Sequence, residues 1–112
     1  MKKSNLITTI IIIFVIILAI WILKNPGSDV SEELARCIGE KSELYTQLGC
    51  THCETQEKMF GSSYKYLKVT DCWFNRDICT DKDITSTPTW IINNEKYRGV
   101  QSIEKLQELT GC

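Results

Sequence analysis

The apolar residues of this chain are gathered at its N-terminus. Residues 6–23 carry no charge and are mostly isoleucine, with lysines before and after them. At about 1.5 Å per residue, a helix of this length rises roughly 27 Å, close to the hydrocarbon thickness of a bilayer. A cleaved signal peptide is the alternative, but its apolar part is ordinarily shorter and ends at small residues. The pattern therefore predicts an uncleaved transmembrane signal-anchor helix over residues 6–23.

The charges around this segment predict its orientation. Lys2 and Lys3 precede it, whereas Lys24 alone follows closely and acidic residues come soon after. Because positive flanks stay in the cytoplasm, residues 1–5 are expected inside the cell and the rest outside. All six cysteines lie between Cys37 and Cys112, a density that suits an oxidising compartment. We expect a single-pass protein of the cell membrane with a linker over residues 24–30 and an extracytoplasmic domain over residues 31–112.

Beyond the linker, the spacing of apolar and polar residues predicts a small α/β domain. A helix capped by Asp29 or Ser31 is expected to end near Gly39, and apolar alternation predicts a strand over residues 43–48. The further elements expected are a helix over 50–60, a strand over 64–70, a hairpin of 89–92 and 95–100 that turns at Asn93–Asn94, and a last helix capped by Ser102.

Length and charge narrow the possible functions. The chain has 112 residues and a formal net charge of −1, which allows one small domain and gives no basic patch. Nucleic acid is therefore not expected as a partner. A domain of this size buries a small core and often depends on covalent crosslinks.

The Cys50-Thr51-His52-Cys53 motif carries the candidate chemistry. It falls where a strand meets a helix, so Cys50 is expected at a helix N-terminus, where free N–H groups and the helix dipole favour a thiolate. His52 is a neighbouring group that can be positive and favour the thiolate further. The motif predicts a redox-active disulfide, with no other cofactor and no metal. Half of a zinc site and an inert crosslink are the alternatives.

Together with this motif, Thr87-Pro88-Thr89-Trp90 and the 97–102 run before the last helix resemble the thioredoxin superfamily. More narrowly, the chain is similar to the small thioredoxin-like domains associated with homologues of vitamin K epoxide reductase. The resemblance covers nearly all of residues 34–112. It implies a compact thioredoxin-like fold, in which helices flank a central mixed sheet.

The resemblance also implies roles for four residues. Cys50 corresponds to the exposed nucleophile and Cys53 to the buried resolving cysteine. Pro88 corresponds to a cis-proline that faces the two sulfurs, although an X–Pro bond taken alone is ordinarily trans. The backbone of Thr87 is then expected to pair with an extended segment of the substrate.

Two positions depart from the pattern of the superfamily. Gly49 stands where an aromatic residue commonly precedes the first cysteine. Leu44 stands where thioredoxins place a buried carboxylate that exchanges a proton with the second cysteine, and Glu43 is a weak substitute. The missing acid argues against a thioredoxin-like reductant.

The four other cysteines allow three pairings from the sequence alone. The resemblance implies structural disulfides Cys72–Cys79 and Cys37–Cys112. The alternative is that Cys72 and Cys79 form a second redox pair that relays electrons.

The remaining candidate residues are interpreted as structural. The Trp73–Phe74 pair is expected to cover the small core rather than to form a docking patch, and Trp90 is expected in the core or at the rim of the site. Glu54, Glu57 and Lys58 are interpreted as a solvated helix face.

The predicted function is a membrane-anchored extracytoplasmic thiol-disulfide oxidoreductase. In the favoured version it donates disulfides to secreted proteins, and a membrane partner of the vitamin K epoxide reductase type, implied by the resemblance, re-oxidises it. A tethered reductase or isomerase is the second reading. A zinc-stabilised binding module without turnover is the third.

Overall fold

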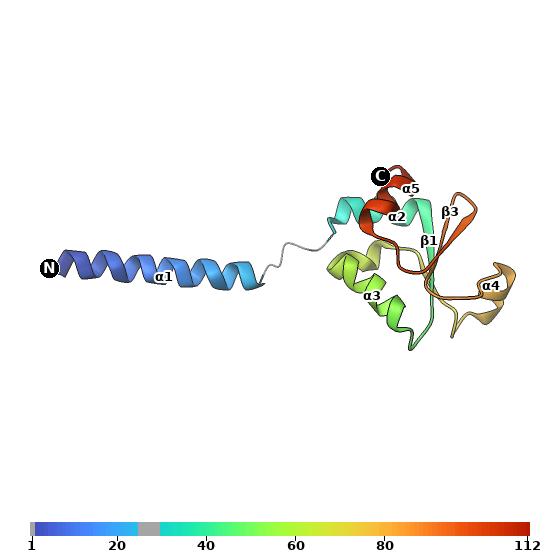
Figure 1. Cartoon of the computed structure of the whole chain (residues 1–112), viewed down its shortest axis with the longest axis horizontal. Coiled ribbons are helices and arrows are strands. Elements are labelled where there is room, and N and C mark those ends of the chain that lie inside the picture. Colours follow the sequence, from blue (N-terminus) through green and yellow to red (C-terminus); the bar gives the residue numbers. More distant parts are fainter. Residues whose placement is uncertain (1, 25–29) are drawn as a thin grey trace.

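The computed structural model of the chain describes residues 2–24 and 30–112 (Figure 1). Most of the predicted linker over 24–30, including the candidate cap Asp29, lies outside the described residues. Helix α1 (Lys2–Lys24) contains the apolar segment, and none of its residues is buried. By length and composition α1 can cross a membrane, although a signal sequence near the N-terminus passes the same test. Lys24, which the prediction assigned to the linker, is the last residue of α1.

The domain begins with α2 (Glu32–Lys41). Its cap is Ser31, one of the two residues predicted for that role, and the Ser31 hydroxyl accepts from the Leu34 N–H at 3.2 Å. The helix continues two residues beyond Gly39. Glycine at position 39 is explained by packing rather than by helix termination, since a Cβ there would clash with the carbonyl oxygen of Tyr66. Gly39 therefore lets α2 lie close to the segment that contains Tyr66.

Four strands form a mixed sheet in the order β2-β1-β3-β4. Their bounds are β1 (Ser42–Thr46), β2 (Val69–Asp71), β3 (Thr89–Ile92) and β4 (Glu95–Arg98). β1 is parallel to β2 and antiparallel to β3, and β3 is antiparallel to β4. The β3–β4 hairpin turns at Asn93 and Asn94 as predicted, both with positive φ of 53° and 64°.

Three strand predictions were wrong in their extent. β4 ends at Arg98, two residues before the end predicted for the strand over 95–100. β1 ends at Thr46, and Leu48 is exposed beyond it. Of the predicted strand over 64–70, only the last residues join the sheet, and Gly61–Tyr66 instead form a 3-10 helix, η1. The aromatic residues that favoured a strand, Tyr64 and Tyr66, pack against the core beside α2 and α3.

Three helices complete the domain, namely α3 (Thr51–Phe60), α4 (Arg76–Asp81) and α5 (Ile103–Thr110). α3 and α5 occupy the predicted places, and Ser102 caps α5 by accepting from the Lys105 N–H at 3.1 Å. The short α4 lies in a segment that the sequence pattern left without an element, because its six residues carry no apolar periodicity.

The core lies between α2, α3 and α5 and one face of the sheet. Leu44 and Trp90 are paired across β1 and β3, and both are fully buried. The other members of this core are Ala35, Ile38, Phe60, Leu67, Ile92 and Leu106. Trp90 is thus a core residue, and the mixed sheet flanked by helices is the thioredoxin-like fold that the resemblance implied.

Candidate redox-active site

Cys50 and Cys53 begin α3, directly after the turn that follows β1. Cys50 is the N-cap residue, and its Sγ accepts from the Cys53 N–H at 3.1 Å. This N–H is one of the donors that the first turn of a helix leaves free, so it favours negative charge on Cys50. Cys50 is half-exposed, whereas Cys53 is 6% exposed. An attacking thiolate from outside can therefore reach Cys50 far more readily than Cys53.

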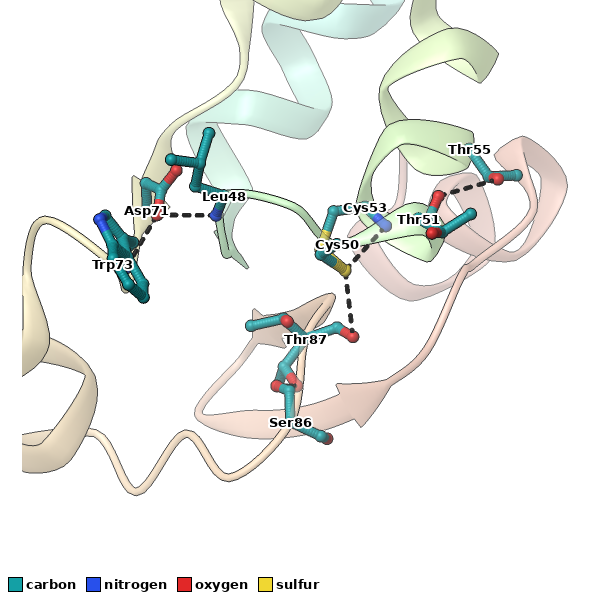
Figure 2. The surroundings of a disulfide bond; sticks show 10 residues. Leu48, Cys50, Thr51, Cys53, Thr55, Asp71, Trp73, Ser86 and Thr87 are labelled. Atoms are coloured by element: carbon teal, nitrogen blue, oxygen red, sulfur yellow. Dashed lines mark hydrogen bonds between the residues drawn. A yellow bond between two sulfur atoms is a disulfide. The ribbon is translucent and has the colours of Figure 1, made fainter.

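The two cysteines are joined by a disulfide, and their Cα atoms lie 5.2 Å apart. On the other side of Cys50, the carbonyl oxygen of Thr87 lies 3.6 Å from Cys50 Sγ (Figure 2). The Thr87–Pro88 peptide bond is cis, and Pro88 is fully buried. The structure thus brings together Cys50, Cys53, Thr87 and Pro88. Cys50 and Thr87, which are in contact, lie 37 positions apart along the chain.

Gly49 makes the turn into this site. Its φ is +83°, a conformation that side chains with a Cβ rarely adopt. An aromatic residue here would be strained at this φ. The backbone conformation therefore explains one of the two departures from the superfamily pattern.

His52 lies exposed on the first turn of α3. It is not among the residues that line the pocket beside Cys53. Its electrostatic effect on Cys50 stays a prediction.

A pocket of about 320 Å³ opens beside Cys50 and Cys53, on the side of α3 that faces β2. Residues of four segments line it: the end of β1 and its turn, α3, η1 and β2. They are Thr46, Gln47, Leu48, Gly49, Cys50, Cys53, Glu54, Glu57, Tyr64, Val69 and Asp71.

Apart from the two cysteines, the ionisable groups of this pocket are three carboxylates and one phenol. Burial, followed by the nearby charges of Glu57 and Asp71, raises the pKa of Tyr64 to about 12. Asp71 accepts two backbone hydrogen bonds at one carboxylate oxygen, from Trp73 N–H at 2.8 Å and Leu48 N–H at 3.3 Å (Figure 2). Asp71 thereby holds the turn before Cys50 against the segment that follows β2.

The sequence interpretation missed this pocket. It assigned Glu54 and Glu57 to a solvated helix face, and both are indeed exposed, but both also line the pocket. The signal that was available for Glu57 is its spacing, four residues after Cys53, which places the two side chains on the same face of α3. No local signal points to Tyr64 or Asp71, because they reach the pocket through the tertiary fold.

Leu44 is fully buried in the core, as its apolar side chain requires. Glu43, the suggested substitute for the missing acid, accepts a hydrogen bond from the Tyr45 hydroxyl at 2.5 Å and lines a different groove, together with Lys68 and Lys82. Burial, then the Glu43 hydrogen bond, raises the pKa of Tyr45 to about 12. Glu43 does not line the pocket beside Cys53.

The four other cysteines are also paired. Cys37 is bonded to Cys112 and Cys72 to Cys79, with Cα separations of 6.0 and 5.7 Å. Among residues 2–24 and 30–112 there is no free cysteine and no group of three or more His, Cys, Asp or Glu side chains placed to hold a metal ion.

The expectation that Trp73 and Phe74 cover the core was wrong. Their exposed fractions are 49% and 70%, and Arg76 places its guanidinium 5.3 Å from the ring centroid of Trp73. The Cys72–Cys79 disulfide closes this segment into a short ring. Within this ring both aromatic side chains are exposed to solvent rather than packed in the core.

Comparison with known proteins gives a partial match. No family model matches the chain. The thiol-disulfide oxidoreductase LTO1 of Arabidopsis thaliana is 32% identical over 79 residues, which cover 62% of this chain and 21% of that protein. The chain thus corresponds to about a fifth of the length of that relative.

Among solved structures, the NTD_N/C domain of alkylhydroperoxide reductase AhpF from Enterococcus faecalis aligns with 75% of this chain and 46% of its own. Its TM-score is 0.47, at 18% identity. The chain itself combines a thioredoxin-like fold and a paired C-x-x-C motif with sequence similarity to part of a thiol-disulfide oxidoreductase.

Proposed function

We propose that this protein is a membrane-anchored thiol-disulfide oxidoreductase whose domain, residues 31–112, lies on the outer side of the membrane. One observation carries the proposal: a half-exposed Cys50 at the N-terminus of α3 is bonded to a buried Cys53 and lies next to Thr87. The similarity to part of LTO1 supports the same chemistry.

In the proposed reaction the Cys50–Cys53 disulfide is passed to reduced secreted proteins. A substrate thiolate attacks Cys50 Sγ, the bond to Cys53 breaks, and Cys53 leaves with the electron pair. A second substrate thiolate then attacks the substrate sulfur of the mixed disulfide and releases Cys50 as a thiolate. The Cys53 N–H, 3.1 Å from Cys50 Sγ, stabilises that leaving group. Two electrons have moved from the substrate dithiol to the protein.

Two further elements of the proposal concern the membrane. α1 keeps the domain at the bilayer surface, which raises its effective concentration toward other membrane proteins. A membrane oxidase of the vitamin K epoxide reductase type then returns the Cys50–Cys53 pair to the disulfide. The partner rests on the sequence resemblance, and the outward orientation rests on Lys2 and Lys3, which precede the apolar segment of α1.

The central test is trapping of substrate in intact cells. Cys53→Ser leaves Cys50 free to form a mixed disulfide that cannot be resolved from within, so disulfide-linked complexes should accumulate. Cys50→Ser is the matched control and should trap none, because Cys53 is buried. Equal trapping by both variants, or by neither, contradicts the proposed nucleophile.

The direction of electron flow is tested by the redox state and potential of the pair. A donor of disulfides should hold Cys50–Cys53 oxidised in growing cells, with a potential above the roughly −270 mV of thioredoxin. A potential well below that value would indicate that the protein is a tethered reductase rather than a donor of disulfides. Digestion of the domain by a protease added outside the cells tests the orientation.

A further inference from the structure

The chemistry proposed for this site leaves one proton without an assigned partner. When Cys53 leaves the disulfide it becomes a thiolate in a buried position, where charge is unfavourable, and it must gain a proton. When it attacks a mixed disulfide it must first lose that proton. Leu44 cannot exchange a proton, and Glu43 is hydrogen-bonded to Tyr45 beside a different groove. Another group has to serve.

The pocket beside Cys53 contains the candidates. The ionisable side chains that face it, apart from the two cysteines, are Glu54 and Glu57 on α3, Tyr64 on η1 and Asp71 on β2. At about 320 Å³ the pocket has room for water between these groups and Cys53.

Three of the four candidates are less suited to the task. Tyr64 keeps its proton at neutral pH, because burial and the nearby charges of Glu57 and Asp71 raise its pKa to about 12. The carboxylate of Asp71 is engaged by the N–H groups of Leu48 and Trp73. Glu54 stands four residues after Cys50 and one after Cys53, so it lies on the helix face of the wrong cysteine.

Glu57 has the required position. It follows Cys53 by four residues, so the two side chains neighbour each other on one face of α3, and both line the same pocket. Its charge is one of those that raise the pKa of Tyr64, which lines the same pocket. In the described part of the chain, no hydrogen bond or ion pair ties the Glu57 carboxylate to another side chain.

We propose that Glu57 is the carboxylate that exchanges a proton with Cys53 through the pocket between α3 and β2. The inference rests on the proposed function of the Cys50–Cys53 pair. When Cys53 leaves with the electron pair of the broken S–S bond, the Glu57 carboxylate takes up a proton from solvent and passes it through water to Cys53. In the reverse step the Cys53 thiol gives its proton to the Glu57 carboxylate, and the resulting thiolate attacks the Cys50 sulfur of the mixed disulfide.

The test follows closure of the Cys50–Cys53 bond in the full-length purified chain, with Cys37–Cys112 and Cys72–Cys79 left oxidised. Reduced protein reacts with oxidised glutathione at Cys50, and release of the second glutathione reports the attack by Cys53. A positioned acid or base contributes roughly 10²–10⁴-fold to such steps. Glu57→Gln should therefore slow closure at least tenfold near pH 7, and the deficit should shrink as pH rises, because hydroxide then removes the proton.

Glu54→Gln is the matched control. It removes the same charge from the same helix and the same pocket, and it should change the closure rate less than twofold. Glu57→Asp keeps a carboxylate at a shorter reach and should close faster than Glu57→Gln. Equal slowing by Glu54→Gln and Glu57→Gln would mean that the rate depends only on the total charge of the pocket, and it would overturn the proposal.

The two proposals fail in distinguishable ways. If the wild-type chain forms no Cys50–Cys53 bond with glutathione, the redox function itself is wrong. If the wild type closes and Glu57→Gln closes as fast at every pH, only the role of Glu57 is wrong. Thermal unfolding of each variant shows whether a slow rate reflects damage to the fold.

Discussion

Two disulfides of the domain, Cys50–Cys53 and Cys37–Cys112, differ in loop length and in their surroundings. Cys50–Cys53 joins residues three positions apart at the start of one helix, while Cys37–Cys112 joins α2 to the last residue, 75 positions away. Cys50 is a half-exposed residue whose sulfur has an N–H donor at 3.1 Å, whereas Cys112 packs against the hydrophobic core. Because a crosslink restricts the unfolded chain more as its loop grows, the long ring stabilises the fold and the short one can open without unfolding it.

The largest effect is expected from opening the long ring. Replacing both Cys37 and Cys112 by serine should lower the free energy of unfolding by about 4–5 kcal/mol in the loop-entropy model. A domain of this size has only about 5 kcal/mol or somewhat more in total. Denaturant unfolding measures the loss, and the potential of Cys50–Cys53 in the remaining folded fraction should be unchanged.

The pair Cys72 and Cys79 provides the control for this prediction. Its ring is closed over a separation of seven residues, so the double serine variant should lose only about 2.5 kcal/mol in the same model. A larger loss of unfolding free energy on removal of Cys72–Cys79 than on removal of Cys37–Cys112 would mean that packing around each bond, rather than the length of its loop, governs the stability. A change in the potential of Cys50–Cys53 would instead point to the electron relay.

A second prediction concerns the contact between the redox helix and the core. Gln56 of α3 is fully buried, and its Oε1 accepts from Trp90 Nε1 at 3.0 Å and from Gln101 N–H at 2.8 Å. Gln56→Leu leaves the buried Trp90 Nε1–H and the half-buried Gln101 N–H without this acceptor, which should cost about 3 kcal/mol of unfolding free energy. Trp90 lies in β3, two residues after Pro88, so the change also weakens the contact between α3 and the strand that follows Pro88.

The matched variant for Gln56→Leu is Gln107→Leu, on the half-exposed face of α5. A surface substitution of this kind is expected to stay within about 0.5 kcal/mol. Similar losses from the two variants would show that the buried amide does not join α3 to the core. Tryptophan fluorescence, measured with Trp21 and Trp73 replaced by phenylalanine, reports independently whether the surroundings of Trp90 have changed.

These residues also mark the limit of what the sequence predicts. The helix caps at Ser31 and Ser102 and the turn at Asn93–Asn94 are local features, because each depends on hydrogen bonds or φ values within a few residues, and the sequence predicted all of them. The C-x-x-C motif was equally local.

The errors occur where distant segments decide the structure. The segment around Tyr64 has the composition of a strand, but contacts with α2 and α3 hold it as a 3-10 helix. The pocket beside Cys53 escaped prediction for the same reason. It forms only when η1 and β2 are brought to α3 by the fold, so Glu57 looked like one more solvated charge.

The smallest predicted effect is at Gly49, where the turn enters the redox site. A Cβ added there meets no atom within 4 Å, so Gly49→Ala has room, and its cost comes only from the φ of +83°. That conformation should cost about 1–2 kcal/mol of unfolding free energy. Gly49→Asn should cost less than Gly49→Ala, because asparagine tolerates positive φ better. Equal costs for the two variants, measured by denaturant unfolding, would mean that the turn relaxes to negative φ, and the backbone conformation would then not explain why glycine precedes Cys50.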